Sequence, residues 1–505
     1  MSLILLLALP ALGAALAALL PDRPGRIAGT GAAAGTLLVA ALLPIGRAGG
    51  HGAIVPWHQV DVAWVPALHL RFHVGVDGIS WPLVVLTALL TLLCCGYTIW
   101  RVPVPPTGLD RPDEEPPRTG PRGSLLIALL LVIEVGILGV FSALDLVLFF
   151  VFFEVVLLPM YAVIAVWGGT ERRAAARKFV LYTLFGSMLL LAGVFVVVAN
   201  AGTADLVALT THHPLGRGTQ ILAFVLLALA FAVKSPLWPL HTWLPDAHTE
   251  APTVGSVILA GVLLKMGTYG LLRVGVGVLP AGAHALAPAL GVLATAAILI
   301  GGLVCLRQNE LKRLIAYSSV GHMGFVVLGI ATLTATGFQA SLIGNIAHGL
   351  LTGLLFFLAG AIKDRTHTGE LSALGGLREV MPGLAGVLGF AAIGSLGLPG
   401  LAGFWGELFA VYATFRHGGP LWIVLGVFAA AGGALAAAYL LRLLRRVTHG
   451  PAAPAVAGLR PTLAGAEVVA WSPLVLLALA VGLAPPLVLA VTAGPVHALI
   501  EAVTR

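Results

Sequence analysis

The sequence predicts an all-α polytopic membrane protein with about 14 transmembrane helices. Only 10% of the residues are charged and 59% are hydrophobic, whereas a soluble domain has about 25% charged residues. The mean hydropathy is +1.02, and apolar runs of about 20 residues, enough to cross a bilayer, recur along the whole chain. The predicted spans lie near residues 2–20, 27–45, 79–100, 124–141, 144–167, 177–199, 219–239, 250–272, 287–306, 313–333, 339–362, 383–415, 420–441 and 469–495.

The first span has the length of a membrane-crossing helix and lacks the basic segment that opens a signal peptide. The basic balance of the chain, with a pI near 9.6, does not indicate nucleic-acid binding, because no Lys/Arg cluster is interleaved with aromatic residues. The three cysteines, Cys94, Cys95 and Cys305, form no CxxC pair, so neither zinc nor an iron–sulfur cluster is expected. No GxGxxG, P-loop or haem motif occurs either. We therefore expect no cofactor and no metal in this chain.

The charges of the loops predict the orientation. Of the 28 Lys and Arg residues, 20 fall in the odd-numbered loops and six in the even-numbered loops and the C-terminus. Because positively charged loops stay in the cytoplasm, both termini should face outward, to the periplasm. The segment 101–123 is rich in Pro and mixed in charge, which predicts an extended cytoplasmic loop.

Two lysines, Lys234 and Lys265, are embedded in apolar spans. An ammonium near the middle of a bilayer costs about 2.5–3.5 kcal/mol on insertion scales, so it is retained where a partner or an aqueous cavity receives it. Pro236 and Pro239 follow Lys234 and should break the seventh span, which is tolerated around a cavity or inside protein. A buried cation beside a broken helix indicates an ion-translocating protein.

Carboxylates also lie inside the spans. Glu154 is in the fifth span, Glu134 is in the fourth, and Glu407 follows a Gly/Pro-rich break in the twelfth. Each must be neutral, paired or hydrated. Glu154 and Lys234 are natural partners if their spans pack together, although such a pair could also be a static packing element, as could Glu134.

Four histidines join this pattern. His241 and His248 follow the first break, whereas His322 and His348 lie within the tenth and eleventh spans. An imidazole titrates near neutral pH and can pass on a proton. The alternative for each is a core histidine that is hydrogen-bonded to a carbonyl.

The two broken spans, seven and twelve, are five spans apart. Spans 4–8 and 9–13 would then be two five-helix units of opposite topology, because five is odd; inverted repeats with broken helices mark the transport site of many transporters. We expect the chain to divide into residues 1–123 (spans 1–3 and a loop), 124–272 (first repeat), 273–445 (second repeat) and 446–505 (the last helix).

Several strings support a resemblance, namely FAVKSPLWPLHTWLPDAHTEAP, LKRLIAYSSVGHMGFV, IAHGLLTGLLFFLAG and GLPGLAGFWGE. They resemble the antiporter-like subunits of respiratory complex I, the proton-translocating NADH:quinone oxidoreductase, over about residues 75–445. The glutamate in the twelfth span is similar to the M-type, since L- and N-type subunits usually carry a lysine there.

The resemblance implies proton pumping coupled to quinone reduction elsewhere, a role as a subunit of that enzyme, and a place in the plasma (inner) membrane. It implies that Glu154 and Lys234 act as a coupled pair, with Lys265 as the central relay and Glu407 as the terminal residue. His322 and His348 would lie between the last two. The partners would be the lipid bilayer and the L-, N- and K-type subunits of the membrane arm.

Three alternatives stay open. A subunit of a Mrp-type cation/proton antiporter would share the lysines but exchange sodium, and a membrane-bound hydrogenase subunit would have the same bundle. An inactive scaffold would use the charges for packing alone. The sequence leaves ion identity, stoichiometry and quinone type undetermined.

Overall fold

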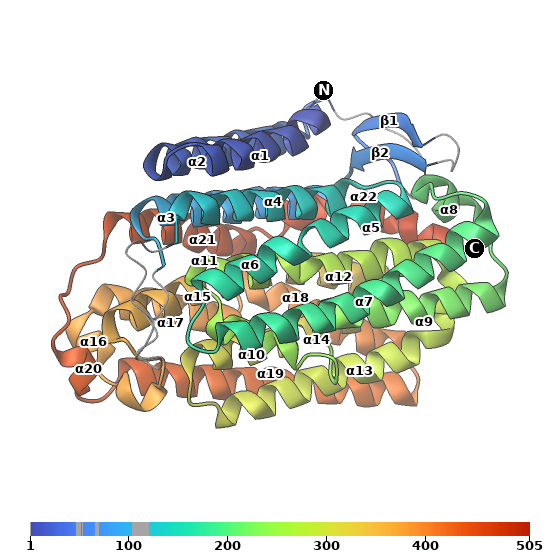
Figure 1. Cartoon of the computed structure of the whole chain (residues 1–505). Helices are drawn as coiled ribbons and strands as arrows, with labels where there is room; N and C mark the ends of the chain where they lie inside the picture. The colour runs from blue at the N-terminus through green and yellow to red at the C-terminus, as the bar shows by residue number, and fades with distance from the viewer. Residues whose placement is uncertain (1, 47–51, 53, 66–69, 104–120, 505) are drawn as a thin grey trace.

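The computed structural model describes residues 2–46, 52, 54–65, 70–103 and 121–504. Its helices lie side by side, most with their axes in one direction (Figure 1). The α-helices are α1 (Ser2–Leu19), α2 (Asp22–Leu42), α3 (Trp81–Trp100), α4 (Gly123–Ser142), α5 (Leu146–Val155), α6 (Leu157–Trp167), α7 (Arg172–Ala201), α8 (Leu206–His212), α9 (Arg217–Lys234), α10 (Trp243–Glu250), α11 (Thr253–Ile258), α12 (Lys265–Gly270), α13 (Pro280–Arg307), α14 (Leu311–Ala331), α15 (Ala335–Thr366), α16 (Leu377–Val380), α17 (Pro382–Ser395), α18 (Ala402–His417), α19 (Pro420–Thr448), α20 (Pro454–Ala457), α21 (Gly465–Leu483) and α22 (Pro486–Thr504). Two π-helical segments, η2 (Leu259–Leu263) and η3 (Leu271–Val276), and a 3₁₀ turn, η4 (Leu371–Ala373), complete the helices.

Fourteen helical segments of the described residues are long and apolar enough to cross a membrane. This confirms the predicted class of a polytopic helical membrane protein. The predicted twelfth span is two shorter helices, α17 and α18, separated at the Gly/Pro-rich segment where the sequence predicts a break. One span differs from the prediction. The predicted fourteenth span, 469–495, is also two helices, α21 and α22, which meet at Ala484 and Pro485.

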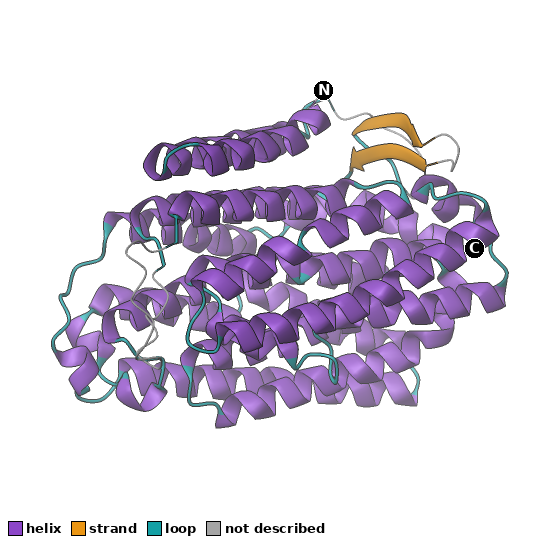
Figure 2. Cartoon of the chain, viewed as in Figure 1, coloured by secondary structure: helices purple, strands orange, loops and turns teal. Residues whose placement is uncertain are grey.

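One hairpin departs from the all-α prediction. Strands β1 (His58–Val65) and β2 (Leu70–Val76) pair antiparallel and stand out in Figure 2 at one end of the bundle. Val and aromatic residues alternate there with polar ones, which is the pattern of a half-buried strand. Both chain termini lie at this hairpin end (Figure 1).

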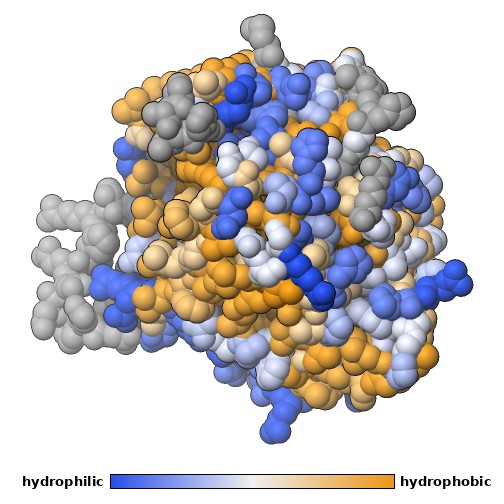
Figure 3. Space-filling view, turned by 90° about the vertical axis from the view of Figure 1, so that its right-hand side faces the viewer, coloured by the Kyte–Doolittle hydropathy of each residue, from blue (hydrophilic) through white to orange (hydrophobic). Residues whose placement is uncertain are grey.

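The surface is that of a membrane protein. Large apolar side chains are exposed along the helix sides, for example Leu181, Phe185, Met188 and Phe195 on α7. Such continuous apolar exposure marks a face that contacts lipid or another subunit. Figure 3 looks onto the hairpin end, where polar side chains are interspersed with apolar ones.

The two predicted repeats share a capping motif at their second helix. The side chain of Asp145 caps α5 and Glu310 caps α14. Each cap residue also forms an antiparallel bridge to an acidic residue beyond the next span, Asp145 with Asp205 and Glu310 with Glu370. The equal spacing of both pairs supports a structural repeat of about 165 residues, as expected for two copies of one unit.

Candidate functional site

Lys265 lies at the centre of the bundle and is completely buried. It follows η2, and a π-helical turn inside a helix is frequently found at a functional site. Its ammonium Nζ donates to the backbone oxygen of Ala260 and lies 2.6 Å from Nδ1 of His348 on α15. Since an ammonium can only donate, Nδ1 of His348 is the accepting nitrogen.

His322 and Glu407 continue this row. Nδ1 of His322, on α14, donates to Oε1 of Glu407, on α18, across 2.8 Å. The rings of His322 and His348 are 5.8 Å apart between centroids. Four helices, α12, α15, α14 and α18, thus place the polar groups in the order Lys265, His348, His322 and Glu407. The resemblance implied that both histidines lie between Lys265 and Glu407, without an order for the two.

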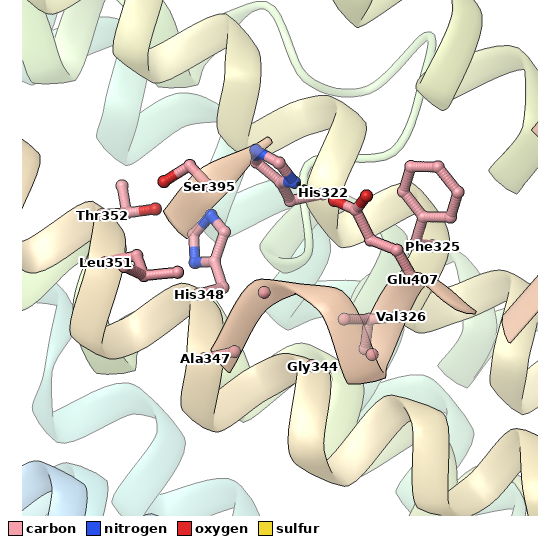
Figure 4. A pocket seen from close by; sticks show the side chains of 12 residues that line it. His322, Phe325, Val326, Gly344, Ala347, His348, Leu351, Thr352, Ser395 and Glu407 are labelled. Atoms are coloured by element: carbon pink, nitrogen blue, oxygen red, sulfur yellow. Dashed lines mark hydrogen bonds and ion pairs between the residues drawn. The ribbon is translucent and has the colours of Figure 1, made fainter. Parts of the chain in front are cut away.

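A small cavity lies between the two histidines (Figure 4). The volume that the centre of a water molecule can occupy in it is about 30 Å³. About 10–15 Å³ by this measure is enough to hold one water molecule. Ser395 and Thr352 also line it. Nε2 of His322, Nε2 of His348 and Oγ of Ser395 are buried without a hydrogen-bond partner. Most of the cavity lining is apolar, but the cavity lies beside these protonatable nitrogens and is large enough for water.

The break between α17 and α18 shapes the Glu407 end of this row. Gly397 and Gly400 have φ of +79° and +91°, values that glycine adopts without steric cost. A Cβ built on Gly397 would lie 3.0 Å from Oε2 of Glu407. The interrupted backbone therefore packs directly on the carboxylate.

The first half holds Lys234 and Glu154. Lys234 is the last residue of α9 and is buried; its Nζ lies 4.7 Å from the ring centroid of Phe153, a cation–π distance. Phe153 also packs on Phe231 of α9, with ring centroids 6.4 Å apart. Oε1 of Glu154 is buried without a partner, and the ion pairs among the described residues do not include Glu154 with Lys234. The helices pack as expected, but the two charges do not touch.

The ends of α9 and α12 are in close contact, which brings the two lysine segments together. A Cβ built on Gly267 would lie 2.3 Å from Oγ of Ser235 and 2.8 Å from the carbonyl of Phe231. Ser235 follows Lys234, and its Oγ is buried without a partner. A hydroxyl without a protein partner therefore lies where the segments of Lys234 and Lys265 meet.

The other two histidines stand apart from the row. His248 is completely buried and stacks on Phe356 with ring centroids 4.4 Å apart. His241 packs edge-on against Tyr317, 6.0 Å between centroids. Both keep at least one ring nitrogen without a partner, and His248 is within electrostatic range of Lys265. Their predicted relay role has no hydrogen bond to support it.

Two buried cations differ from the position that the sequence predicted. Lys312 and Arg273 were assigned to loops, but Lys312 is buried with its Nζ 2.9 Å from the oxygen of Ala251, and Arg273 forms a buried ion pair with Asp77. A charge at the edge of an apolar run gives no signal in the sequence for burial. Glu134, which the sequence placed inside the fourth span, is buried, and neither of its carboxylate oxygens has a partner.

A larger polar cavity of about 690 Å³ opens near α10, α14 and the end of α15. Its charged lining residues are Arg101, Glu250, Lys312, Lys363 and Asp364. Burial raises the pKa of Glu250 above its ordinary value, so this carboxyl binds a proton more readily than a free one.

A second group of charges lies at the hairpin end, between the spans. Nδ1 of His73 is 3.0 Å from Oδ2 of Asp205, and Oδ1 of Asp205 accepts from the amide of Ala208. Burial works to raise the pKa of Asp205, but these hydrogen bonds outweigh it and the pKa is lowered. The pair fastens the hairpin to the segment before α8.

Among the described residues, no group of three or more His, Cys, Asp or Glu side chains is arranged to hold a metal ion. All three cysteines are free and buried. The absence of a cofactor from this chain stays a prediction.

Comparison with known proteins gives four concordant findings. Residues 143–431 match the family model described as NADH:quinone oxidoreductase/Mrp antiporter, TM. The chain is 39% identical over 453 residues to NADH-quinone oxidoreductase subunit M of Rhodobacter capsulatus, covering 87% of this chain and 84% of that protein. It superimposes on a chain of respiratory complex I from Thermus thermophilus with a TM-score of 0.87 and 29% identity, covering 100% of both chains. It also superimposes on the Mrp complex from Dietzia sp. DQ12-45-1b with a TM-score of 0.83 and 25% identity, covering 100% of this chain and 52% of that one.

Proposed function

The chain belongs to the NADH:quinone oxidoreductase/Mrp antiporter family, and from this premise we propose that its buried polar row carries protons across the membrane. It is a multi-pass subunit of the membrane arm of NADH-quinone oxidoreductase, in the plasma membrane beside other membrane-arm subunits. The relay residues, their order of action and the outward position of both termini are our proposals.

The observation that carries the proposal is the row Lys265–His348–His322–Glu407 with its cavity. Each of these groups can hold and release a proton, and the bilayer interior retains such groups at large cost, mainly along ion pathways. A scaffold needs no protonatable nitrogens without partners around a water-sized space, because each unpaired buried group costs about 1–3 kcal/mol.

The tautomers set by the hydrogen bonds define a path. With Lys265 donating to Nδ1 of His348, the proton of neutral His348 is on Nε2. With Nδ1 of His322 donating to Glu407, neutral His322 has an accepting Nε2. A water molecule between them can then accept from His348 and donate to His322. As Lys265 protonates Nδ1 of His348, the proton on Nε2 moves through water to His322, and the Nδ1 proton of His322 passes to Glu407.

Lys234 and Glu154 act as the switch. The Lys234 ammonium lies on Phe153, one residue from Glu154, whose Oε1 has no partner. A shift of about one side-chain rotamer would bring the charges together and stabilise the charged lysine, whereas their separation favours loss of its proton. Ser235 and Gly267 lie where that proton would move toward Lys265.

Protons would enter through the polar cavity at the end opposite the hairpin. Glu250 and Lys312 line that cavity, and His248 is within electrostatic range of both Lys312 and Lys265. Glu407, beside the broken twelfth span, would release protons on the outer side, because interrupted helices admit water at membrane depth. The driving step must come from neighbouring subunits.

A second candidate is exchange of a cation for protons, favoured by the likeness to the Mrp complex over the whole chain. Sodium-dependent proton movement without NADH oxidation would distinguish it. The higher identity to subunit M over most of both proteins favours the first candidate.

Replacement of Glu407 tests the proposal. Glu407→Gln keeps the shape and the hydrogen bond to His322 but cannot exchange a proton, so pumping per NADH oxidised in membrane vesicles should fall while the complex stays assembled. Glu407→Lys should be tolerated better, because a lysine can take up and release a proton. Glu501→Gln, on the exposed face of α22, is the matched control. Wild-type pumping by Glu407→Gln would remove Glu407 from the path.

A further inference from the structure

The buried ion pair of Arg273 and Asp77 is not used by the proposed relay. Nη2 of Arg273, in η3, contacts Oδ2 of Asp77, just before α3. Each side chain is only 2% exposed. Replacement of a buried ion pair by apolar residues of similar volume is often neutral or stabilising, so packing alone does not require these charges.

The pair lies on the outward continuation of the Lys265 helix. Tyr269 and Arg273 follow Lys265 at intervals of four residues, and neighbours at that interval lie on one face of a helix. The hydroxyl of Tyr269 donates to the oxygen of Phe141 across 3.2 Å and is within electrostatic range of Arg273 and Asp77. Polar groups therefore extend from Lys265 toward the hairpin end, in a second direction from that of His348.

The chemistry of the pair suits a barrier better than a relay. A guanidinium keeps its proton in proteins, so Arg273 cannot pass one on. Oδ1 of Asp77 already accepts from the amides of Ile79 and Ser80, and Oδ2 accepts from Arg273. A fixed cation at a constriction repels protons and other cations, a device that membrane pores use for exclusion.

The C-terminal helix α22 covers the outer side of the pair. A Cβ built on Gly78, next to Asp77, would lie 2.2 Å from the oxygen of Val491. Further along α22, the oxygen of Ala502 is 3.1 Å from Nε2 of His213. The pair is thus enclosed between Tyr269 and α22.

We propose that Arg273, held by Asp77, is an electrostatic barrier that prevents protons on Lys265 from leaking outward along their own helix and so directs them to His348. Arg273 is a positioning residue for the proton path. This inference rests on the proposed role of Lys265.

The test measures passive proton leak in vesicles that contain the assembled complex. After a pH gradient is imposed without NADH, its decay is compared in wild type and in Asp77→Asn/Arg273→Gln, which replaces the ion pair by amides. Lys265 and Arg273 are eight residues apart, which corresponds to about 12 Å of helix. With an effective dielectric constant of about 20, a unit charge at that distance changes the proton occupancy of a site by about tenfold. Asp77 offsets part of the field of Arg273, so the double variant should lose its gradient faster through this chain, by less than this tenfold limit.

Two further variants separate a barrier from damaged packing. Lys265→Leu added to the double variant should restore slow decay, and Arg273→Lys, which keeps a cation, should leak no more than wild type. The proposal would be overturned if the double variant lost its gradient no faster than wild type. It would also be overturned if the leak persisted after Lys265→Leu was added, or if Arg273→Lys leaked faster than wild type. If the double variant does not assemble, Arg273→His replaces it, and its leak must increase as the imidazole loses its charge at higher pH.

A leak independent of pH in Arg273→His, or failure of that variant to assemble as well, would also overturn the barrier. The decay is measured without NADH, whereas the relay is tested by NADH-driven pumping in Glu407→Gln. The barrier and the proposed function can therefore fail separately.

Discussion

His348 is the residue at which the proposed path is most sensitive to a single change. Its Nδ1 is 2.6 Å from the Lys265 ammonium, and its unpaired Nε2 lines the cavity toward His322. A hydrogen bond to a charged group contributes about 1.5–3 kcal/mol. At 1.36 kcal/mol for each factor of ten, its loss changes the proton-transfer equilibrium at Lys265 by about 10- to 150-fold.

Two substitutions separate the two functions of this imidazole. His348→Leu removes both the acceptor for Lys265 and the second protonatable nitrogen, whereas His348→Gln keeps an acceptor but cannot pass a proton through its side chain. Both should lower pumping per NADH oxidised in vesicles. The factor above applies to the step through this chain in His348→Leu, which loses the hydrogen bond, and His348→Leu should also lower the thermal stability of the complex. His417→Gln, at the exposed end of α18, is the matched control.

Two results would contradict a proton path through His348. If His348→Gln pumps like wild type, His348 only holds Lys265 in place and the proton does not pass through its ring. If His348→Leu also pumps like wild type in an assembled complex, the hydrogen bond to Lys265 has no part in transport.

Four other predictions concern different parts of the molecule. Glu154→Ala and Lys234→Ala should each strongly reduce pumping in assembled complex, with Glu154→Asp milder; normal pumping by both Ala variants would make the two residues structural. Thr170→Cys, in the exposed turn before α7, should resist labelling from outside in intact cells, against low background from the buried native cysteines; outside labelling would reverse the topology. Gly397→Ala should destabilise the complex by about 1 kcal/mol, because φ is positive there, and reduce pumping; unchanged melting and pumping would contradict this. Because the folded pKa of Asp205 is lowered, its contribution to stability is complete at neutral pH and is lost as the pH falls through that pKa; melting temperature against pH should show this loss, and Asp205→Asn should flatten it.

The sequence predicted the class of fold and the buried charges that stand inside apolar runs. Lys265 and Glu407 could be recognised because each is far from the ends of its predicted span, where a loop is no alternative. Lys234, at the end of α9, could be recognised because apolar residues continue beyond it. The breaks after Lys234 and before Glu407 could be predicted because Pro and Gly occur there together. Pro485 and Pro486 carry the same signal between α21 and α22, and the prediction of a single span over 469–495 did not use it.

The remaining features depend on tertiary distances that no local pattern contains. Arg273 and Lys312 stand at the ends of apolar runs, where a buried position and a loop have the same composition. Whether Glu154 touches Lys234 depends on the distance between the two side chains across the contact of α5 and α9. There the ring of Phe153 lies against the ammonium. The π-helical turn before Lys265 follows from hydrogen bonding that shifts by one residue, without a sequence mark.

The route of a proton from Lys265 is decided by which neighbour can give up a proton in turn. His348 can, because its second nitrogen faces a cavity that holds water-sized groups. Arg273, eight residues along the same helix, cannot, because its guanidinium stays protonated. One helix thus presents a transferable site on one side of Lys265 and a fixed charge at its outer end. A lateral path through the bundle then requires no moving gate at that end, since the fixed charge opposes outward escape in every state of Lys265.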